Sequence, residues 1–330
     1  MSYKLYITLF FFIFYGCSDR HEQRSVNTNI AIIDTLLKSP YKMSQGNLEP
    51  KDSIQLRYEF NKEVPKQFKF NDSIIYLGNG QSIVGFDLKG EKVLEIKIAE
   101  EILNGIPFSD FEVSEVFNNM YYLLIGRKFI LVDANDSLQK IVFEYNAGGD
   151  KIFSAGKDNF FIPYQSQSSD GGIINSLKKY FDNENKLNDF KSNVDFSGES
   201  FLASNGVIYF ISEGNELHLV SYNERIEPDI IQLEGMIDNR AWVLGFLNDK
   251  LLVKQVSDSG KDIIYELNKN NFKVEKSNLL DIDYSDINQE LLEDEDLFLD
   301  NPNRIFYASY KNSIKVLRIG KSGNATVYSI

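Results

Sequence analysis

The stretch from Gln67 to Ile96 reads QFKFNDSIIYLGNGQSIVGFDLKGEKVLEI, and it predicts four short strands joined by turns. β-Branched and aromatic residues dominate the four apolar runs, and Asn, Asp or Gly residues stand in the breaks between them. The last break, Lys89-Gly90-Glu91, leads into the fourth run. The stretch therefore defines a repeat unit of four strands, and the rest of the chain contains further copies of it.

Two strands of this unit recur along the chain, each copy following a turn. The copies lie roughly 40–55 residues apart, a spacing typical of propeller blades. Copies of the second strand are Met120–Leu124, Asn159–Pro163, Val207–Ile211, Lys250–Val253 and Arg304–Ala308, and copies of the third are Phe129–Asp133, Leu217–Val220, Ile263–Leu267 and Ile314–Arg318. The pattern predicts an all-β fold, a six-bladed β-propeller of four-stranded antiparallel blades. A β-sandwich array or a large barrel is the alternative, although both expect less regular units.

The prediction places six residues at equivalent positions of the second strands. They are Tyr76, Tyr122, Phe161, Tyr209, Leu252 and Phe306. The way in which the ring closes is left open by the sequence. Ile54–Phe60 is able to add an outer strand to the last blade, but Thr326–Ile330 already supplies a fourth strand there.

The N-terminus has the form of a bacterial export signal. Lys4 precedes Leu5–Tyr15, an unbroken run of eleven apolar and hydroxyl residues. A transmembrane helix needs roughly 20 apolar residues, whereas a signal peptide has about 7–15 after a basic start. Cys17, the only cysteine of the chain, follows Gly16 directly and is followed by polar sequence.

This ending resembles the lipobox of bacterial lipoproteins, in which the cysteine becomes the lipidated N-terminus. The resemblance implies a signal peptide over residues 1–16 and a lipid-anchored tether over 17–29, and the repeat predicts a single propeller domain over 30–330. Several acyl chains anchor a protein stably, because each buried CH₂ contributes ~0.8 kcal/mol. The alternative is a plain secretory signal with an incidental cysteine.

The chain as a whole resembles the six-bladed, TolB-like propeller lipoproteins of the Bacteroidota. The lipobox, the tether, the repeat and a composition rich in Asn, Lys, Phe and Ile carry the resemblance. It implies a cell-envelope protein that is anchored to the outer membrane on its periplasmic or surface face. That family supplies no catalytic residues that are transferable to this chain.

The composition excludes several classes of function. The chain has 35 basic and 48 acidic residues, a net charge of −13. It is therefore unsuited to nucleic acid, which proteins bind through Lys and Arg on phosphates. A lone cysteine rules out internal disulfides, and His21 and His218 are the only histidines. Ser-His-Asp, Cys-His and His-rich metal sites are therefore unsupported.

The mouth of the central channel is the expected binding region. A charged residue stands just before the innermost strand of most units, and these residues are Asp110, Asp150, Glu199, Arg240 and Asp296. Four acids at one mouth would focus negative potential there. They would attract Ca²⁺ or an amine, with Arg240 as internal counter-charge. The alternative is a set of ordinary polar loop residues, and no other cofactor is expected.

Three further residues join this candidate site. Trp242, the only tryptophan, lies next to Arg240 and is either a binding anchor or a core residue. Arg127 and Gln165 belong to the turns between second and third strands. Gln165 also begins a longer loop that ends at Gly172, and long loops on rigid scaffolds frequently carry function.

The acidic run 281–296 does not fit a calcium loop. Counted from Asp281, the EF-hand positions for Gly and Glu hold Asp286 and Leu292. A helical excursion between the last two blades fits the run better.

The sequence thus favours a binding or scaffold module over an enzyme. Its partners would be the membrane, through the acyl anchor, and an envelope protein or a small ligand. The alternative is a hydrolase, lyase or cyclotransferase that uses paired carboxylates at the channel mouth.

Overall fold

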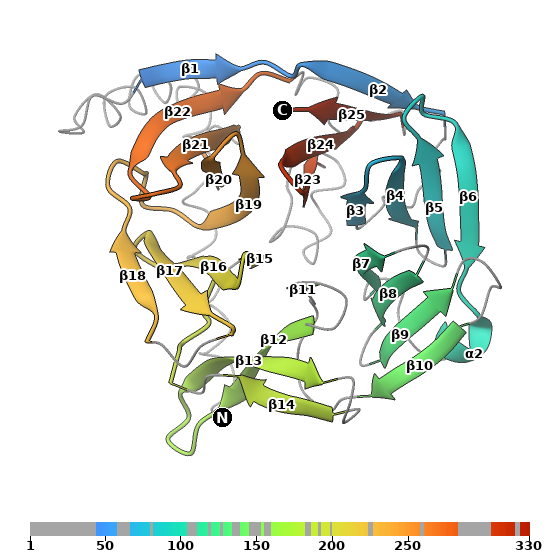
Figure 1. The fold of residues 1–330 in the computed structure, drawn as a ribbon, viewed down its shortest axis with the longest axis horizontal. Coiled ribbons are helices and arrows are strands. Elements are labelled where there is room, and N and C mark those ends of the chain that lie inside the picture. Colours follow the sequence, from blue (N-terminus) through green and yellow to red (C-terminus); the bar gives the residue numbers. More distant parts are fainter. Residues whose placement is uncertain are drawn as a thin grey trace, which may run out of the picture.

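A computed structural model of the chain describes much of the region after residue 43. The described residues are 44–57, 67–79, 82–103, 111–117, 120–125, 128–133, 139–144, 153–154, 160–181, 186–190, 193–198, 200–223, 227–257, 261–282, 305–320 and 324–330. They form a β-propeller whose sheets stand around a central axis (Figure 1). The sheets comprise one of five strands and five of four strands. The all-β propeller prediction is confirmed.

The sheets are numbered here in chain order, and each begins with its innermost strand. The first contains β3 (Gln67–Phe70), β4 (Ile74–Asn79), β5 (Ser82–Asp87) and β6 (Lys92–Lys97), and the helix α2 (Glu100–Leu103) follows it. The second contains β7 (Phe111–Phe117), β8 (Met120–Ile125), β9 (Lys128–Asp133) and β10 (Gln139–Glu144). The third contains β11 (Phe153–Ser154), β12 (Phe160–Gln167), β13 (Ile173–Phe181) and β14 (Lys186–Phe190).

The remaining sheets continue the same order. The fourth contains β15 (Leu202–Ser204), β16 (Val207–Ser212), β17 (Glu216–Ser221) and β18 (Asp229–Gln232). The fifth contains β19 (Ala241–Leu247), β20 (Lys250–Val256), β21 (Asp262–Asn268) and β22 (Val274–Leu280), and β1 (Ser44–Leu48) joins its outer edge. The sixth contains β23 (Ile305–Tyr310), β24 (Ser313–Ile319) and β25 (Ala325–Ser329), and β2 (Asp52–Leu56) completes it.

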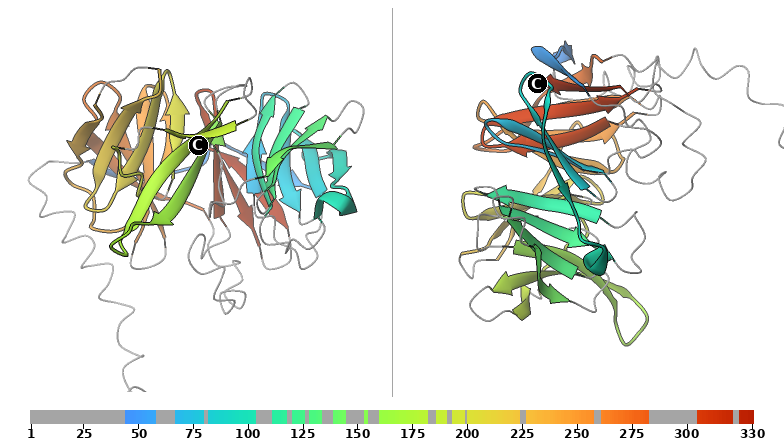
Figure 2. Two further views of the ribbon diagram at one scale, coloured as in Figure 1. Left: turned by 90° about the horizontal axis from the view of Figure 1, so that it is seen from below. Right: turned by 90° about the vertical axis from the view of Figure 1, so that its right-hand side faces the viewer.

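Neighbouring sheets contact one another through their innermost strands all the way round the axis. Each of β3, β7, β11, β15 and β19 contacts the next innermost strand of the series, and β23 contacts β3. In side view the sheets stand next to one another around the axis (Figure 2). Among the described residues, separate buried clusters lie between the first and second, third and fourth, fourth and fifth, fifth and sixth, and sixth and first sheets.

The core between the sixth and first sheets shows how the repeat packs. Phe68 and Ile75 of the first sheet lie in one buried cluster with Leu317 and Val327 of the sixth. Each of these side chains is at most 4% exposed, and burying one stabilises the fold by about 1.5–3 kcal/mol. Ile75 lies in this cluster, whereas its neighbour Tyr76 lies in the cluster that the first sheet shares with the second. The continuous apolar runs of the sequence are thus the pattern of sheets that are covered on both faces.

The N-terminal strands close the ring. β1 pairs in parallel with β22, and β2 pairs antiparallel with β25. The next residue after β2, Arg57, donates its backbone N–H to the carbonyl oxygen of Gly90 at 2.8 Å. Residues 44–57, here called the belt, therefore join the fifth, sixth and first sheets along the rim (Figure 1).

The belt corrects two details of the sequence prediction. β25, which overlaps Thr326–Ile330, is the third strand of its sheet rather than the fourth. Phe306 lies in the innermost strand β23 and not in a second strand, so its predicted equivalence was wrong. The physical reason is that β2 supplies the outermost strand, which moves every strand of the C-terminal unit inward by one place. The other five residues of that set do lie in second strands, because their units take all four strands from consecutive sequence: Tyr76, Tyr122, Phe161, Tyr209 and Leu252.

Gly90 is the point where the first sheet accepts the belt. It has a φ of +84°, and a Cβ added there would overlap the backbone carbonyl oxygen of Gln55 in β2. We expect Gly90→Ala to lower the unfolding free energy by about 1 kcal/mol or more beyond the cost of the backbone conformation itself. Gly171→Ala is the matched control, because Gly171 has a φ of +87° and open space around it. Equal urea midpoints for the two variants would contradict this role of Gly90.

Candidate ligand-binding site

The two faces of the ring carry different connections. On the face called here the loop face, the chain passes into each innermost strand and turns between second and third strands. On the opposite face, the hairpin face, it turns between first and second strands. This division follows from the antiparallel pairing of successive strands in the sheets, from which only β1, parallel to β22, departs among the described strands. The sequence prediction placed the ligand site on the loop face.

Much of the predicted mouth lies outside the described residues. Asp110, Arg127, Asp150, Glu199 and Asp296, together with the lipidation residue Cys17, belong to this group. Their gathering at one mouth stays a prediction.

The other predicted residues lie on two separate sheets. Arg240 is exposed and directly precedes β19, and Trp242 is half-buried in that strand. Gln165 is exposed near the end of β12, where its amide donates to Oδ1 of Asn175 at 3.0 Å. The structure thus brings Arg240 and Trp242 together at the start of the fifth sheet and places Gln165 on the third.

The long loop that was predicted after Gln165 is shorter in the structure. β12 continues to Gln167, β13 begins at Ile173, and the backbone N–H of Ser168 donates to the carbonyl oxygen of Gly172 at 2.9 Å. The segment is therefore an extended hairpin with a five-residue tip, Ser168–Gly172. The side chain of Ser168 donates a hydrogen bond to Asp170 and lowers the pKa of that carboxyl group.

Trp242 belongs to a buried polar cluster between the fifth and sixth sheets. The Lys254 ammonium lies 4.4 Å from the centroid of the Trp242 ring and 3.6 Å from a carboxylate oxygen of Asp262. Tyr307 of β23 donates its hydroxyl to the same carboxylate at 2.5 Å. The Lys254 and Asp262 side chains are 7% and 3% exposed. Ligands therefore have little access to the Lys254–Asp262 pair, and the half-buried rings of Trp242 and Tyr307 flank it across the two sheets.

His218 has a serine partner but lacks the third member of a catalytic triad. Its Nε2 lies 2.8 Å from Oγ of Ser212, and its ring stacks on Phe210. Burial lowers the pKa of the imidazole, although the charge of Glu216 opposes the effect. The buried Nδ1, which a carboxylate orients in a Ser-His-Asp triad, has no hydrogen-bond partner among the described residues. This geometry fits a structural histidine.

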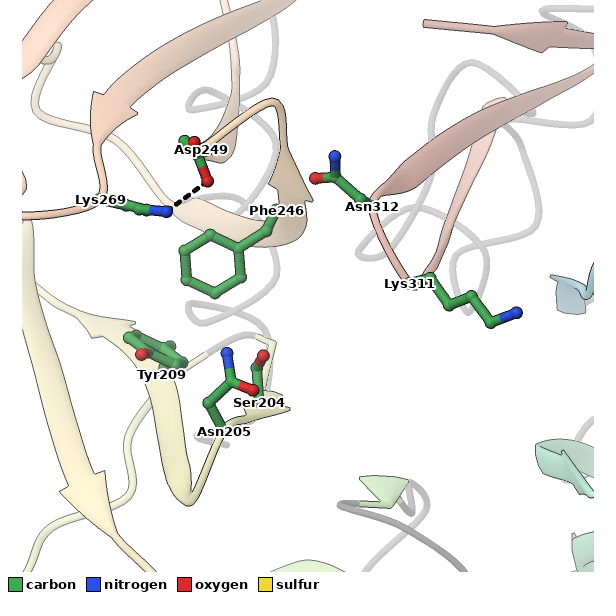
Figure 3. Close-up of a pocket in the computed structure, with 8 residues that line it drawn as sticks. All are labelled: Ser204, Asn205, Tyr209, Phe246, Asp249, Lys269, Lys311 and Asn312. Carbon is green, nitrogen blue, oxygen red and sulfur yellow. Dashed lines mark hydrogen bonds and ion pairs between the residues drawn. The ribbon is translucent and has the colours of Figure 1, made fainter.

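A pocket of about 460 Å³ opens on the hairpin face (Figure 3). This volume lies within the range of about 300–1,000 Å³ that is usual for small-molecule sites. The fourth, fifth and sixth sheets all contribute to it. The residues that line it are Ser204, Asn205, Tyr209, Phe246, Asp249, Lys269, Lys311 and Asn312.

The pocket has one aromatic wall. The rings of Tyr209 and Phe246 are 5.3 Å apart and perpendicular, in an edge-to-face contact between the fourth and fifth sheets. Tyr209 is 8% exposed, and burial raises the pKa of its hydroxyl. Phe246 is only half-buried, so its ring is the part of this pair that is open to a ligand.

Polar groups surround the aromatic wall. Asp249 and Lys269 form an ion pair beside Phe246 (Figure 3). Asn312 accepts a hydrogen bond from the backbone N–H of Asn248 through its Oδ1 at 3.0 Å. Lys311 extends away from the pocket, and its ammonium pairs with Asp72 of the first sheet at 2.5 Å. That hydrogen bond raises the pKa of Lys311.

Sequence reasoning missed this pocket because it considered only the loop face. The signal that was available lies in the short turns between first and second strands. Asn205, Asp249 and Lys311 have φ values of 50°, 64° and 53°, a conformation that non-glycine residues seldom adopt. Such turns bring side chains from successive sheets to the same end of the channel.

Two other kinds of feature are absent from the described parts of the chain. No group of three or more His, Cys, Asp or Glu residues there is arranged to hold a metal ion. No described helix is long and apolar enough to cross a membrane.

Comparisons with known proteins support the fold alone. No protein-family model and no curated protein matches the chain. Among solved structures, a chain of the mitotic checkpoint complex is 6% identical with a TM-score of 0.50, and the match covers 88% of this chain and 94% of that chain. The Neurospora crassa Pan2 WD40 domain is 8% identical with a TM-score of 0.45, covering 80% and 74%. Kluyveromyces lactis Hsv2 is 12% identical with a TM-score of 0.45, covering 78% and 70%. One of these structural neighbours is a WD40 domain by its printed name, and the likeness is one of fold alone.

Proposed function

We propose that this protein is a lipid-anchored binding module of the cell envelope and that its body is a six-bladed propeller. The pocket on the hairpin face carries the proposal of binding. Side chains from three successive sheets line it, and an aromatic wall stands among polar groups. Such a combination is usual for ligand sites, in which a few polar groups orient a ligand against apolar surface.

The contacts around the ring support a count of six blades. The innermost strand of the sixth sheet contacts that of the first, and the belt joins the same two sheets at the rim. A ring closed in this way is a rigid scaffold, because each sheet is held by two neighbours.

The N-terminal sequence supports the anchor. The apolar run Leu5–Tyr15 and the single cysteine Cys17 support export and lipidation. The acidic composition supports the acyl chains as the means of attachment, because a chain with a net charge of −13 is repelled by anionic lipid surfaces. The proposed location is the outer membrane, with the propeller on its periplasmic or surface side.

Fractionation of cells that express the full chain tests the anchor. We expect the native chain in the membrane fraction and the Cys17→Ala variant in the soluble extracytoplasmic fraction, because the substitution removes the thiol that would carry the lipid. Ser18→Ala is the matched control and should stay with the membrane. A Cys17→Ala variant that fractionates like the native chain would refute lipid anchoring.

A further inference from the structure

We infer that the pocket on the hairpin face binds a neutral sugar ring, an inference that rests on the proposed binding function. The first argument is the shape of the apolar wall. The half-buried ring of Phe246 offers one face to the pocket, and its edge-to-face contact with Tyr209 holds it in place. The face of an aromatic ring carries partial negative charge. It therefore attracts the polarised C–H groups that line one side of a pyranose ring.

The second argument is the set of uncharged polar groups around that wall. Ser204 offers a hydroxyl and Asn205 an amide, and neither side chain has a hydrogen-bond partner within the described structure. Asn312 uses Oδ1 to accept from the backbone of Asn248, which leaves its Nδ2 donor available. Donors and acceptors are thus both present, and sugar hydroxyls require both.

The third argument is the balance of charge. The Lys269 ammonium pairs with Asp249, and the Lys311 ammonium points away from the pocket toward Asp72. Neither lysine is left as a free cation for an anionic ligand, and Asp249 is not left as a free anion for an amine. The net charge of −13 also disfavours the approach of an anion. A neutral ligand needs no free counter-charge in the pocket and is not repelled by the negative charge of the protein.

The fourth argument is the position of these groups in the fold. Asn205 and Asn312 lie in turns of the fourth and sixth sheets, and Phe246 stands on the sheet between them. A ring stacked on Phe246 therefore has amides on two sides. This arrangement requires three adjacent sheets of a closed ring, so it is a property of the assembled propeller.

Titration calorimetry with the full chain tests the inference. The probes are glucose, galactose, mannose, N-acetylglucosamine and the disaccharides maltose and cellobiose. Glucuronate and glucosamine are the charged counterparts of glucose. We expect saturable binding of at least one neutral sugar and weaker binding of the charged counterparts. Absence of saturable binding for every neutral sugar, or tighter binding of a charged counterpart, would overturn the inference.

Two variants show whether binding occurs in this pocket. Phe246→Leu keeps an apolar side chain but removes the ring, and it should weaken binding about tenfold. Asn312→Asp keeps the acceptor for Asn248 and removes the Nδ2 donor, which should weaken binding about fivefold. Asn47→Asp is the matched control, because Asn47 is exposed in β1 on the rim. Melting curves identify any variant that fails to fold. If Phe246→Leu does not fold, the affinity of Asn312→Asp still tests whether sugars bind in this pocket. Unchanged affinity in folded pocket variants would refute the site.

A second panel separates this inference from the proposed function. Free amino acids and dipeptides are titrated under the same conditions. If they bind in a manner sensitive to Phe246→Leu while the sugars do not, the sugar inference falls and the binding module stands. If neither panel binds, the inference falls and the proposal of a small-molecule site falls with it. Lipid anchoring is judged separately, by the fractionation of Cys17→Ala.

Discussion

A chain that begins at residue 58 is expected to lose cooperative unfolding, whereas a chain that begins at Ser44 should retain it. The difference between the two is the belt. Without it, β25 loses the whole of its partner strand β2, and β22 loses β1. Leu56, which is 2% exposed, also leaves the core between the sixth and first sheets. Removing one such leucine side chain from a core costs about 2–5 kcal/mol, and the lost strand pairing adds to this.

Circular dichroism in urea and size-exclusion chromatography measure the effect. We expect the shorter chain to unfold without a sharp transition or to aggregate through the exposed edge of β25. A synthetic peptide of residues 44–57, added in excess, should restore part of the transition. The stability of a Leu56→Ala variant of the full chain should lie between the stabilities of the chains that begin at 44 and at 58. Identical urea midpoints for the chains that begin at 44 and at 58 would show that the ring closes without the belt.

Asp262→Asn is expected to produce the largest loss of stability among single substitutions that alter a charge. The Lys254 ammonium would keep its charge inside the interface between the fifth and sixth sheets but lose its carboxylate partner. Removing one member of a buried ion pair typically costs about 3–5 kcal/mol. The Asn side chain is able to accept the hydroxyl of Tyr307 as the carboxylate does, so the expected loss reflects the stranded charge.

A double variant separates charge from packing. Lys254→Met combined with Asp262→Asn removes both charges and preserves the acceptor for Tyr307, so it should be more stable than Asp262→Asn alone. Asp189→Asn is the matched control, because it breaks an ion pair with Lys178 in which the aspartate side chain is 64% exposed. Its cost should stay below about 1 kcal/mol. A loss of similar size for Asp262→Asn and Asp189→Asn would contradict the importance of the buried pair.

Local sequence determined the strands and the fold class of this protein. Short runs of β-branched and aromatic residues, bounded by Asn, Asp and Gly, specify strands whatever surrounds them. For this reason Tyr76, Phe161 and Tyr209 could be assigned to second strands of successive sheets. The apolar run before Cys17 likewise predicts export from residue type and length alone, a prediction that only fractionation can test.

Tertiary structure decided the closure of the ring and the position of the candidate site. β2 pairs with a strand about 270 residues later in the chain. Judged from its own sequence, each of these two strands could be the outermost strand of the sheet. Phe306 was misplaced for the same reason, because the identity of the outermost strand in the last sheet depends on a distant partner. The pocket combines Asn205, Phe246 and Asn312 from three sheets, and each of them is an ordinary turn or strand residue in its own segment. Strand propensity is a local property of the chain, whereas a site between sheets exists only after the ring has brought distant turns to one face.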